Sequence, residues 1–125
     1  MARILVVEDN ADNMLLTVML LQSVGHEVLT AVDAEAGLTL ARQERPDLIL
    51  MDVQLPGMDG LAATALLKAD LATRAIPVIA LTALAMKGDE ERILAAGCDG
   101  YIAKPMRMHE FLATVAAQLA VTLGG

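Results

Sequence analysis

Short apolar runs alternate regularly with longer segments of helical spacing along this chain. The runs are rich in aliphatic and β-branched residues and cover residues 3–7, 27–31, 47–51, 78–81 and 100–103. Between them, apolar side chains recur at three- and four-residue intervals over roughly 10 to 15 positions. The pattern predicts five β-strands, each followed by a helix.

Residues at the segment boundaries are typical of helix ends. Asp12, Asp33 and Asp59 each precede a segment of helical spacing, and a carboxylate there can accept a hydrogen bond from the free N–H groups of the first turn. Gly25 and Gly97 stand where a helix would end in a left-handed residue. These positions support the predicted helices.

The strands are apolar on both faces, which is typical of a parallel sheet covered by helices on both sides. The predicted fold class is therefore α/β, a (βα)5 three-layer sandwich. A length of 125 residues suits one domain and is too short for two, so we expect a single domain spanning residues 1–125. In such a sheet all strands end at one edge, where ligands bind.

Composition excludes several classes of function. The net charge of −7 opposes binding to phosphate backbones, so we expect no direct nucleic-acid partner. The longest apolar runs fall well short of the roughly 18 residues that a membrane span needs, and the N-terminus does not resemble a signal peptide. The single cysteine, Cys98, cannot form an internal disulfide. We expect a soluble, cytoplasmic protein without a membrane partner, with Cys98 as a buried apolar residue.

Polar residues follow four of the predicted strands directly. They are three acids, one hydroxyl and one amine: Glu8, Asp9, Asp52, Thr82 and Lys104. Three carboxylates crowded at one edge repel one another, and a divalent cation relieves that repulsion. Oxygen ligands of this kind favour Mg²⁺, which binds one or two carboxylates and keeps waters or phosphate oxygens in its other positions.

An amine and a hydroxyl beside a metal site indicate that the site also binds an anionic group. If Asp52 carried a phosphoryl group, Lys104 could pair with one oxygen and Thr82 could donate to another. Carboxylates are nucleophiles in phosphoryl transfer, where catalysis is mostly positioning and charge neutralisation. The residues alone also allow Asp52 simply to cap the turn that follows it, but the matching polar residues at the other strand ends favour a phosphoryl acceptor.

Four ordered motifs then identify a family resemblance. They are VVEDN (residues 6–10), PDLILMDVQLPGMDG (46–60), IPVIALTA (76–83) and GYIAKP (100–105). Over essentially its whole length the chain resembles the receiver domains of two-component response regulators. The resemblance implies a sheet of strand order 2-1-3-4-5, as in the chemotaxis receiver.

The same resemblance implies a phosphorelay function with Mg²⁺ as cofactor. Asp52 would take a phosphoryl group from a sensor histidine kinase or a histidine phosphotransfer protein. Asp9 and Asp52 would bind the metal directly, Glu8 through a water, and Gln54 through its backbone carbonyl. Glu8 is a departure, since many relatives carry aspartate there, and a bridging water accommodates the difference.

The resemblance also implies how phosphorylation is read out. Thr82 and Lys104 would contact the phosphoryl group, and a cis peptide bond between Lys104 and Pro105 would aim the lysine inward. Tyr101 matches an aromatic residue that becomes buried when the threonine hydroxyl is drawn toward phosphate. The face formed by the fourth helix, the fifth strand and the fifth helix would then rearrange for protein binding.

The segment from Leu81 to Pro105 is similar to that of stand-alone receivers of the DivK type, which bind and regulate histidine kinases. A downstream protein, possibly a kinase, is therefore the expected target, and Leu61 and Leu66 are candidate exposed residues for a partner. A domain cut from a longer hybrid kinase is an alternative origin. Two other functions are compatible with some of these residues: a Mg²⁺-dependent phosphohydrolase with Asp52 as nucleophile, and a receiver-like module that docks without phosphate. We expect a signalling switch that assists its own phosphorylation and dephosphorylation, and not an enzyme.

Overall fold

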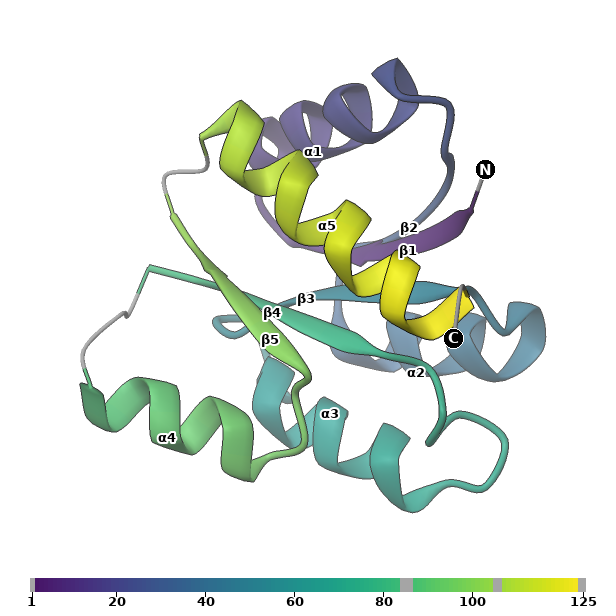
Figure 1. Ribbon diagram of the computed structural model, residues 1–125. Helices are drawn as coiled ribbons and strands as arrows, with labels where there is room; N and C mark the ends of the chain where they lie inside the picture. The colour runs from purple at the N-terminus through teal and green to yellow at the C-terminus, as the bar shows by residue number, and fades with distance from the viewer. Residues whose placement is uncertain (1, 84–86, 105–106, 124–125) are drawn as a thin grey trace.

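The computed structural model describes residues 2–83, 87–104 and 107–123 and contains five parallel strands in one sheet (Figure 1). The strands are β1 (Arg3–Val7), β2 (Glu27–Ala31), β3 (Leu48–Asp52), β4 (Val78–Thr82) and β5 (Gly100–Ala103). The helices are α1 (Ala11–Ser23), α2 (Ala34–Glu44), α3 (Gly60–Ala69), α4 (Lys87–Ala95) and α5 (Met108–Leu123). The sheet order is β2-β1-β3-β4-β5, so the predicted fold class and the order 2-1-3-4-5 are both confirmed.

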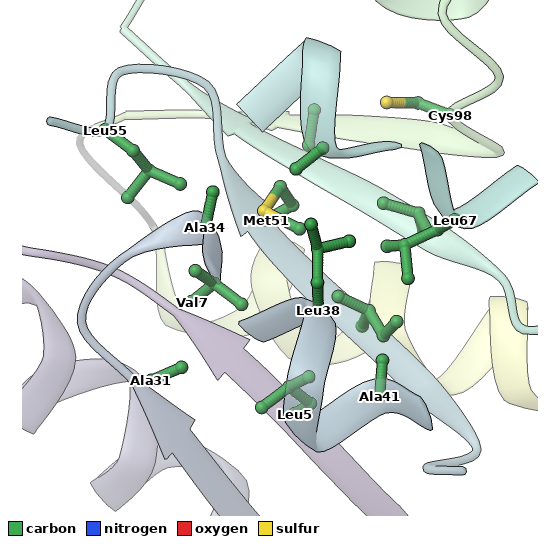
Figure 2. Packing of buried hydrophobic residues seen from close by; sticks show 14 of the residues in the cluster. Leu5, Val7, Ala31, Ala34, Leu38, Ala41, Met51, Leu55, Leu67 and Cys98 are labelled. Atoms are coloured by element: carbon green, nitrogen blue, oxygen red, sulfur yellow. The ribbon is translucent and has the colours of Figure 1, made fainter. Parts of the chain in front are cut away.

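The sheet lies between two layers of helices, α1 and α5 on one face and α2, α3 and α4 on the other (Figure 1). Side chains alternate between these layers along each strand. In β1, Ile4 and Val6 pack with the α1–α5 layer, whereas Leu5 and Val7 pack with the other. Figure 2 shows part of the apolar cluster between the sheet and the α2–α3–α4 layer, in which Leu5 and Val7 lie with residues of α2, β3 and α3.

The helix ends follow the predicted chemistry with one correction. Asp33 and Asp59 cap α2 and α3 by accepting from backbone N–H groups, as predicted. The predicted cap at Asp12 is wrong: α1 begins one residue after Asn10, whose side chain accepts from the Asn13 N–H, and Asp12 lies inside the first turn. Asparagine and aspartate are about equally good caps, so the sequence around residues 10–12 does not decide between them.

Strand β3 begins and ends one residue later than predicted. The prediction ended it at Met51, but Asp52 is still paired, opposite Leu81 of β4, and the next backbone N–H, of Val53, also donates to Leu81. Asp52 is thus held by the sheet itself. Within the described ranges, no helix is both long and apolar enough to cross a membrane.

Two predictions about individual apolar residues had mixed outcomes. Cys98 is buried in the cluster of Figure 2, as expected. Leu66 is exposed on α3, whereas Leu61 packs partly against the same cluster. Only one of the two leucines is therefore available as the exposed surface that the sequence indicated.

Candidate functional site

Three charged residues meet at the carboxyl edge of the sheet because of strand alternation. Glu8, Asp52 and Lys104 each stand two positions after a residue that packs in the α1–α5 layer: Val6, Leu50 and Ile102. A two-residue period returns a side chain to the same face. The three charged groups therefore converge although the chain separates Glu8 from Lys104 by 96 positions.

Lys104 joins the two buried carboxylates. Its Nζ donates to Glu8 Oε1 and to Asp52 Oδ2, both at 2.9 Å. The acid side chains are only 1% and 5% exposed, and that of Lys104 is 18% exposed. Backbone N–H groups hold the other two oxygens, since Gln54 donates to Asp52 Oδ1 at 2.9 Å and Asn10 donates to Glu8 Oε2 at 3.3 Å. Both carboxylates are fixed in orientation.

A third carboxylate completes an acidic cluster open to solvent. Asp9 is exposed, and one carboxylate oxygen from each of Glu8, Asp9 and Asp52 lies within 4.8 Å of the others. Such a set of oxygen donors is chemically suited to a hard divalent cation. Gln54 follows this cluster in the loop after β3, and the role predicted for its carbonyl stays a prediction.

Burial and mutual repulsion change the proton affinities in this cluster. Burial raises the pKa of Glu8 to about 7, with a contribution from its hydrogen bond with Asp52, while Lys104 and the Asn10 N–H act in the opposite direction. Burial also lowers the pKa of Lys104, but its hydrogen bonds to Asp52 and Glu8 outweigh that effect, so the net shift is upward. The lysine stays charged, and Glu8 titrates near neutral pH in the metal-free protein.

The raised pKa of Glu8 predicts a stability that depends on pH. The folded state holds the Glu8 proton more tightly than the unfolded state, whose pKa is about 4.5, so this contribution is complete below pH 4.5 and is lost as the pH rises to about 7. At about 1.4 kcal/mol per pKa unit, the loss is on the order of 3 kcal/mol. Chemical denaturation in EDTA of the protein and of Glu8→Gln should show a difference in unfolding free energy that falls by this amount over that range. If the difference in unfolding free energy between the two proteins did not change with pH, the assignment to Glu8 would be wrong.

Thr82 and Tyr101 lie on the opposite face of the sheet from Asp52. Thr82 is the buried last residue of β4, and its carbonyl accepts from the Lys104 N–H at 2.8 Å. The register pairs Tyr101 of β5 with Ala80 of β4, two residues before Thr82. Thr82 and Tyr101 therefore lie on neighbouring strands and point to the same side of the sheet, the side that α4 covers. The half-buried Tyr101 donates from its hydroxyl to Glu90 Oε1 of α4 at 2.5 Å. Lys104 is thus bonded to the last residue of β4, and Tyr101 on the neighbouring strand is bonded to α4.

The hydrogen bond to Glu90 raises the pKa of Tyr101, with smaller effects from burial and from the charge of Glu90. Replacing Glu90 by alanine is therefore expected to lower this pKa toward that of an ordinary tyrosine. The chain has one tyrosine and no tryptophan, so an ultraviolet titration of phenolate absorbance reports on Tyr101 alone. Glu91→Ala is the matched control. An equal pKa in Glu90→Ala and Glu91→Ala would show that the bond does not form in solution.

Sequence reasoning found the residues that the structure brings together and missed two of their partners. Glu8, Asp9, Asp52 and Lys104 converge as predicted. Asn10 was not singled out, although a polar residue directly after two acids could have suggested a helix start. Glu90 lies in a run of three acids, residues 89–91, which is typical of a solvated helix face and does not single it out as a partner of Tyr101. The predicted cis bond at Pro105 lies outside the described residues.

Comparisons with known proteins agree with this geometry. The model of the response regulator receiver domain family matches residues 4–116, so the chain belongs to that family and is a phosphoacceptor of two-component signalling. Among individual proteins, it is 49% identical over 116 residues to the polar-differentiation response regulator DivK of Brucella anthropi, covering 93% of this chain and 94% of that protein.

Solved structures show the same fold. The receiver domain of the sensor histidine kinase PA1611 of Pseudomonas aeruginosa PAO1, solved with a magnesium ion in its active site cleft, superposes with a TM-score of 0.89 at 38% identity over 95% of this chain and 98% of that one. The chemotaxis response regulator CheY4 of Vibrio cholerae gives a TM-score of 0.90 at 28% identity over 94% and 98%. The fold is therefore that of CheY-like receivers.

Proposed function

We propose that Asp52 is the phosphoryl acceptor of this receiver and that a histidine kinase or histidine phosphotransfer protein is the donor. The observation that carries the proposal is the attachment of Lys104 Nζ to both Glu8 and Asp52 at 2.9 Å. The ammonium group of Lys104 binds one oxygen of Asp52, and the Gln54 N–H binds the other. Asp52 lies at the carboxyl edge of the sheet, where the polar residues that follow the strands converge. In the transfer, the bond from phosphorus to the donor's imidazole nitrogen breaks and a bond from phosphorus to an Asp52 oxygen forms.

Mg²⁺ fits the acidic cluster as cofactor. We assign its protein ligands to Asp9, Asp52 and the Gln54 carbonyl, with Glu8 acting through water. The support is the set of three carboxylate oxygens within 4.8 Å of one another, which carry more negative charge than Lys104 alone balances. When bound, the ion would neutralise charge on the acceptor and on the incoming phosphoryl oxygens. Lys104 and the Thr82 hydroxyl would contact the remaining oxygens.

The output of the switch would be a change on the α4–β5–α5 face. A phosphoryl group on Asp52 would compete with the carboxylates for Lys104 and would draw Thr82 toward it. Tyr101, which shares a face with Thr82 and binds Glu90 of α4, would then leave its present contact. The altered face would bind a downstream protein, and the similarity to DivK favours a histidine kinase as that partner.

Cytoplasmic localisation and the lack of an independent enzymatic activity complete the proposal. The protein would assist transfer to and loss from its own Asp52 without turning over a separate substrate. A phosphohydrolase is disfavoured because many hydrolases with an aspartate nucleophile have a second acid two residues later, and that position is Gln54 here. The negative charge also disfavours a nucleic-acid target.

Incubation with phosphoramidate and Mg²⁺, followed by mass spectrometry, tests the proposal. One phosphoryl group per chain is expected, mapped to the peptide that contains Asp52, and EDTA should suppress it. Phosphorylation elsewhere in the chain, or steady release of phosphate from unrelated phosphomonoesters, would contradict the proposal. Affinity capture with phosphorylated and unphosphorylated protein would then identify the partner retained by each form.

A further inference from the structure

Gly60, the first residue of α3, lies against the backbone of Asp52. It is buried, and its N–H donates to the Val53 carbonyl at 3.0 Å. Helix α3 therefore begins directly against the C-terminal end of β3 (the tip of β3). Glycine is the residue that permits such an approach of two backbones.

A side chain at position 60 would collide with the acceptor residue. A Cβ there would lie 2.0 Å from the Asp52 carbonyl oxygen and 2.8 Å from its carbonyl carbon, whereas Cβ contacts below 3.0 Å essentially never occur. The obstacle is backbone, so no rotamer change relieves it. Helix α3 and the tip of β3 would have to separate by at least about 1 Å, the difference between 3.0 and 2.0 Å.

We infer that Gly60 is a positioning residue for phosphoryl transfer, because the start of α3 holds the backbone of Asp52 where its carboxylate meets Lys104 and the acidic cluster. This inference rests on the proposed function of Asp52. Both Asp52 oxygens are already committed, one to Lys104 Nζ and one to the Gln54 N–H, so a shift of the tip disturbs both contacts together. Asp59 fixes the same helix start, since its side chain accepts from the Ala62 N–H at 2.8 Å.

Gly60→Ala is the direct test. Misplacement of a reacting group by 1 Å can reduce a rate about 100-fold, so phosphorylation by phosphoramidate at saturating Mg²⁺ should slow by roughly 10- to 100-fold per folded molecule. In an amide NMR spectrum, the largest shifts are expected at Val53 and Gln54. Leu67→Ala is the control for stability alone: it removes a buried side chain two turns further along α3 and should leave the rate per folded molecule unchanged.

The outcomes separate the possible explanations. A rate within twofold of the original in folded Gly60→Ala, or an equal slowing in Leu67→Ala, would overturn the inference. If Gly60→Ala does not fold, Asp59→Ala decides, because it loosens the helix start without adding a clash: a severalfold slower rate supports the inference and an unchanged rate overturns it. If the original protein accepts no phosphoryl group at Asp52, the proposed function itself fails, and this inference with it.

Discussion

Asp52→Asn is expected to take up no detectable phosphoryl group from phosphoramidate and Mg²⁺. The amide is a far weaker nucleophile than the carboxylate, and it cannot form the mixed anhydride that a carboxylate forms with phosphate. The variant should nevertheless fold, because an amide oxygen can still accept from the Gln54 N–H and Lys104 keeps Glu8 as a partner. Intact-protein mass spectrometry after incubation measures the uptake.

The same substitution should change the titration of Glu8. The hydrogen bond and the charge of Asp52 both raise the pKa of Glu8, so its value of about 7 should fall in Asp52→Asn. Carboxyl carbon NMR can follow this group in the metal-free protein. Asp12→Asn is the matched control, since it removes the same charge from an exposed position in the first turn of α1 and should affect neither result. Normal phosphoryl uptake by Asp52→Asn would show that another residue is the acceptor.

Lys104→Ala is expected to accept phosphate slowly and to lose the response that follows. Without the ammonium group, a phosphoryl group on Asp52 has no cation linking it to β5, so the change at Tyr101 should disappear. Tyrosine fluorescence measures that change directly, because Tyr101 is the only tyrosine of a chain without tryptophan. The expected result is a fluorescence change on phosphorylation in the original protein and none in phosphorylated Lys104→Ala.

Removal of Lys104 should also destabilise the metal-free protein. It leaves Glu8 and Asp52 buried without their shared cation, and breaking a buried ion pair in this way typically costs about 3–5 kcal/mol. The cost should be smaller at pH 6 than at pH 8, because a protonated Glu8 carries no charge, and Mg²⁺ should restore part of the loss. Thermal and chemical denaturation with and without Mg²⁺ measure these differences.

Lys68→Ala separates the signalling role of Lys104 from its structural one. The side chain of Lys68 is 21% exposed, similar to Lys104, and its Nζ binds Asp99 at 3.0 Å and the Ile76 carbonyl at 2.8 Å. The Lys68→Ala substitution should therefore lower the stability of the protein and leave the fluorescence response to phosphorylation intact. If Lys104→Ala bound its partner in a fully phosphate-dependent way, the coupling role assigned to this lysine would be wrong.

The parts of the structure that follow from chain periodicity were predictable. The alternation of short apolar runs with segments of helical spacing located the five strands to within one residue. The common edge of a parallel sheet then brought Glu8, Asp52 and Lys104 together. The predicted strand at residues 47–51 lies one residue too early, because an apolar run that precedes a carboxylate does not show that Asp52 is itself paired. In the structure, Asp52 is still paired with β4 because Lys104 and a backbone N–H satisfy its carboxylate.

The contacts that were missed depend on where side chains of different elements meet. The bond from Tyr101 to Glu90 requires the position of α4 relative to β5, and a run of three acids does not indicate which one faces the sheet. The close approach of Gly60 to Asp52 likewise depends on how the loop after β3 returns the chain. Sequence spacing constrains neither distance.

The ion pair between Glu8 and Lys104 also determines when the site around Asp52 can form during synthesis of the chain. The lysine that pairs with both Glu8 and Asp52 directly follows the last strand, so a nascent chain on the ribosome lacks this contact until β5 has emerged and paired with β4. Until then Glu8 and Asp52 lack the ammonium group that pairs with both of them in the folded protein. A polypeptide whose β5 has not yet emerged would therefore lack the lysine contact on which the proposed phosphoryl transfer to Asp52 depends.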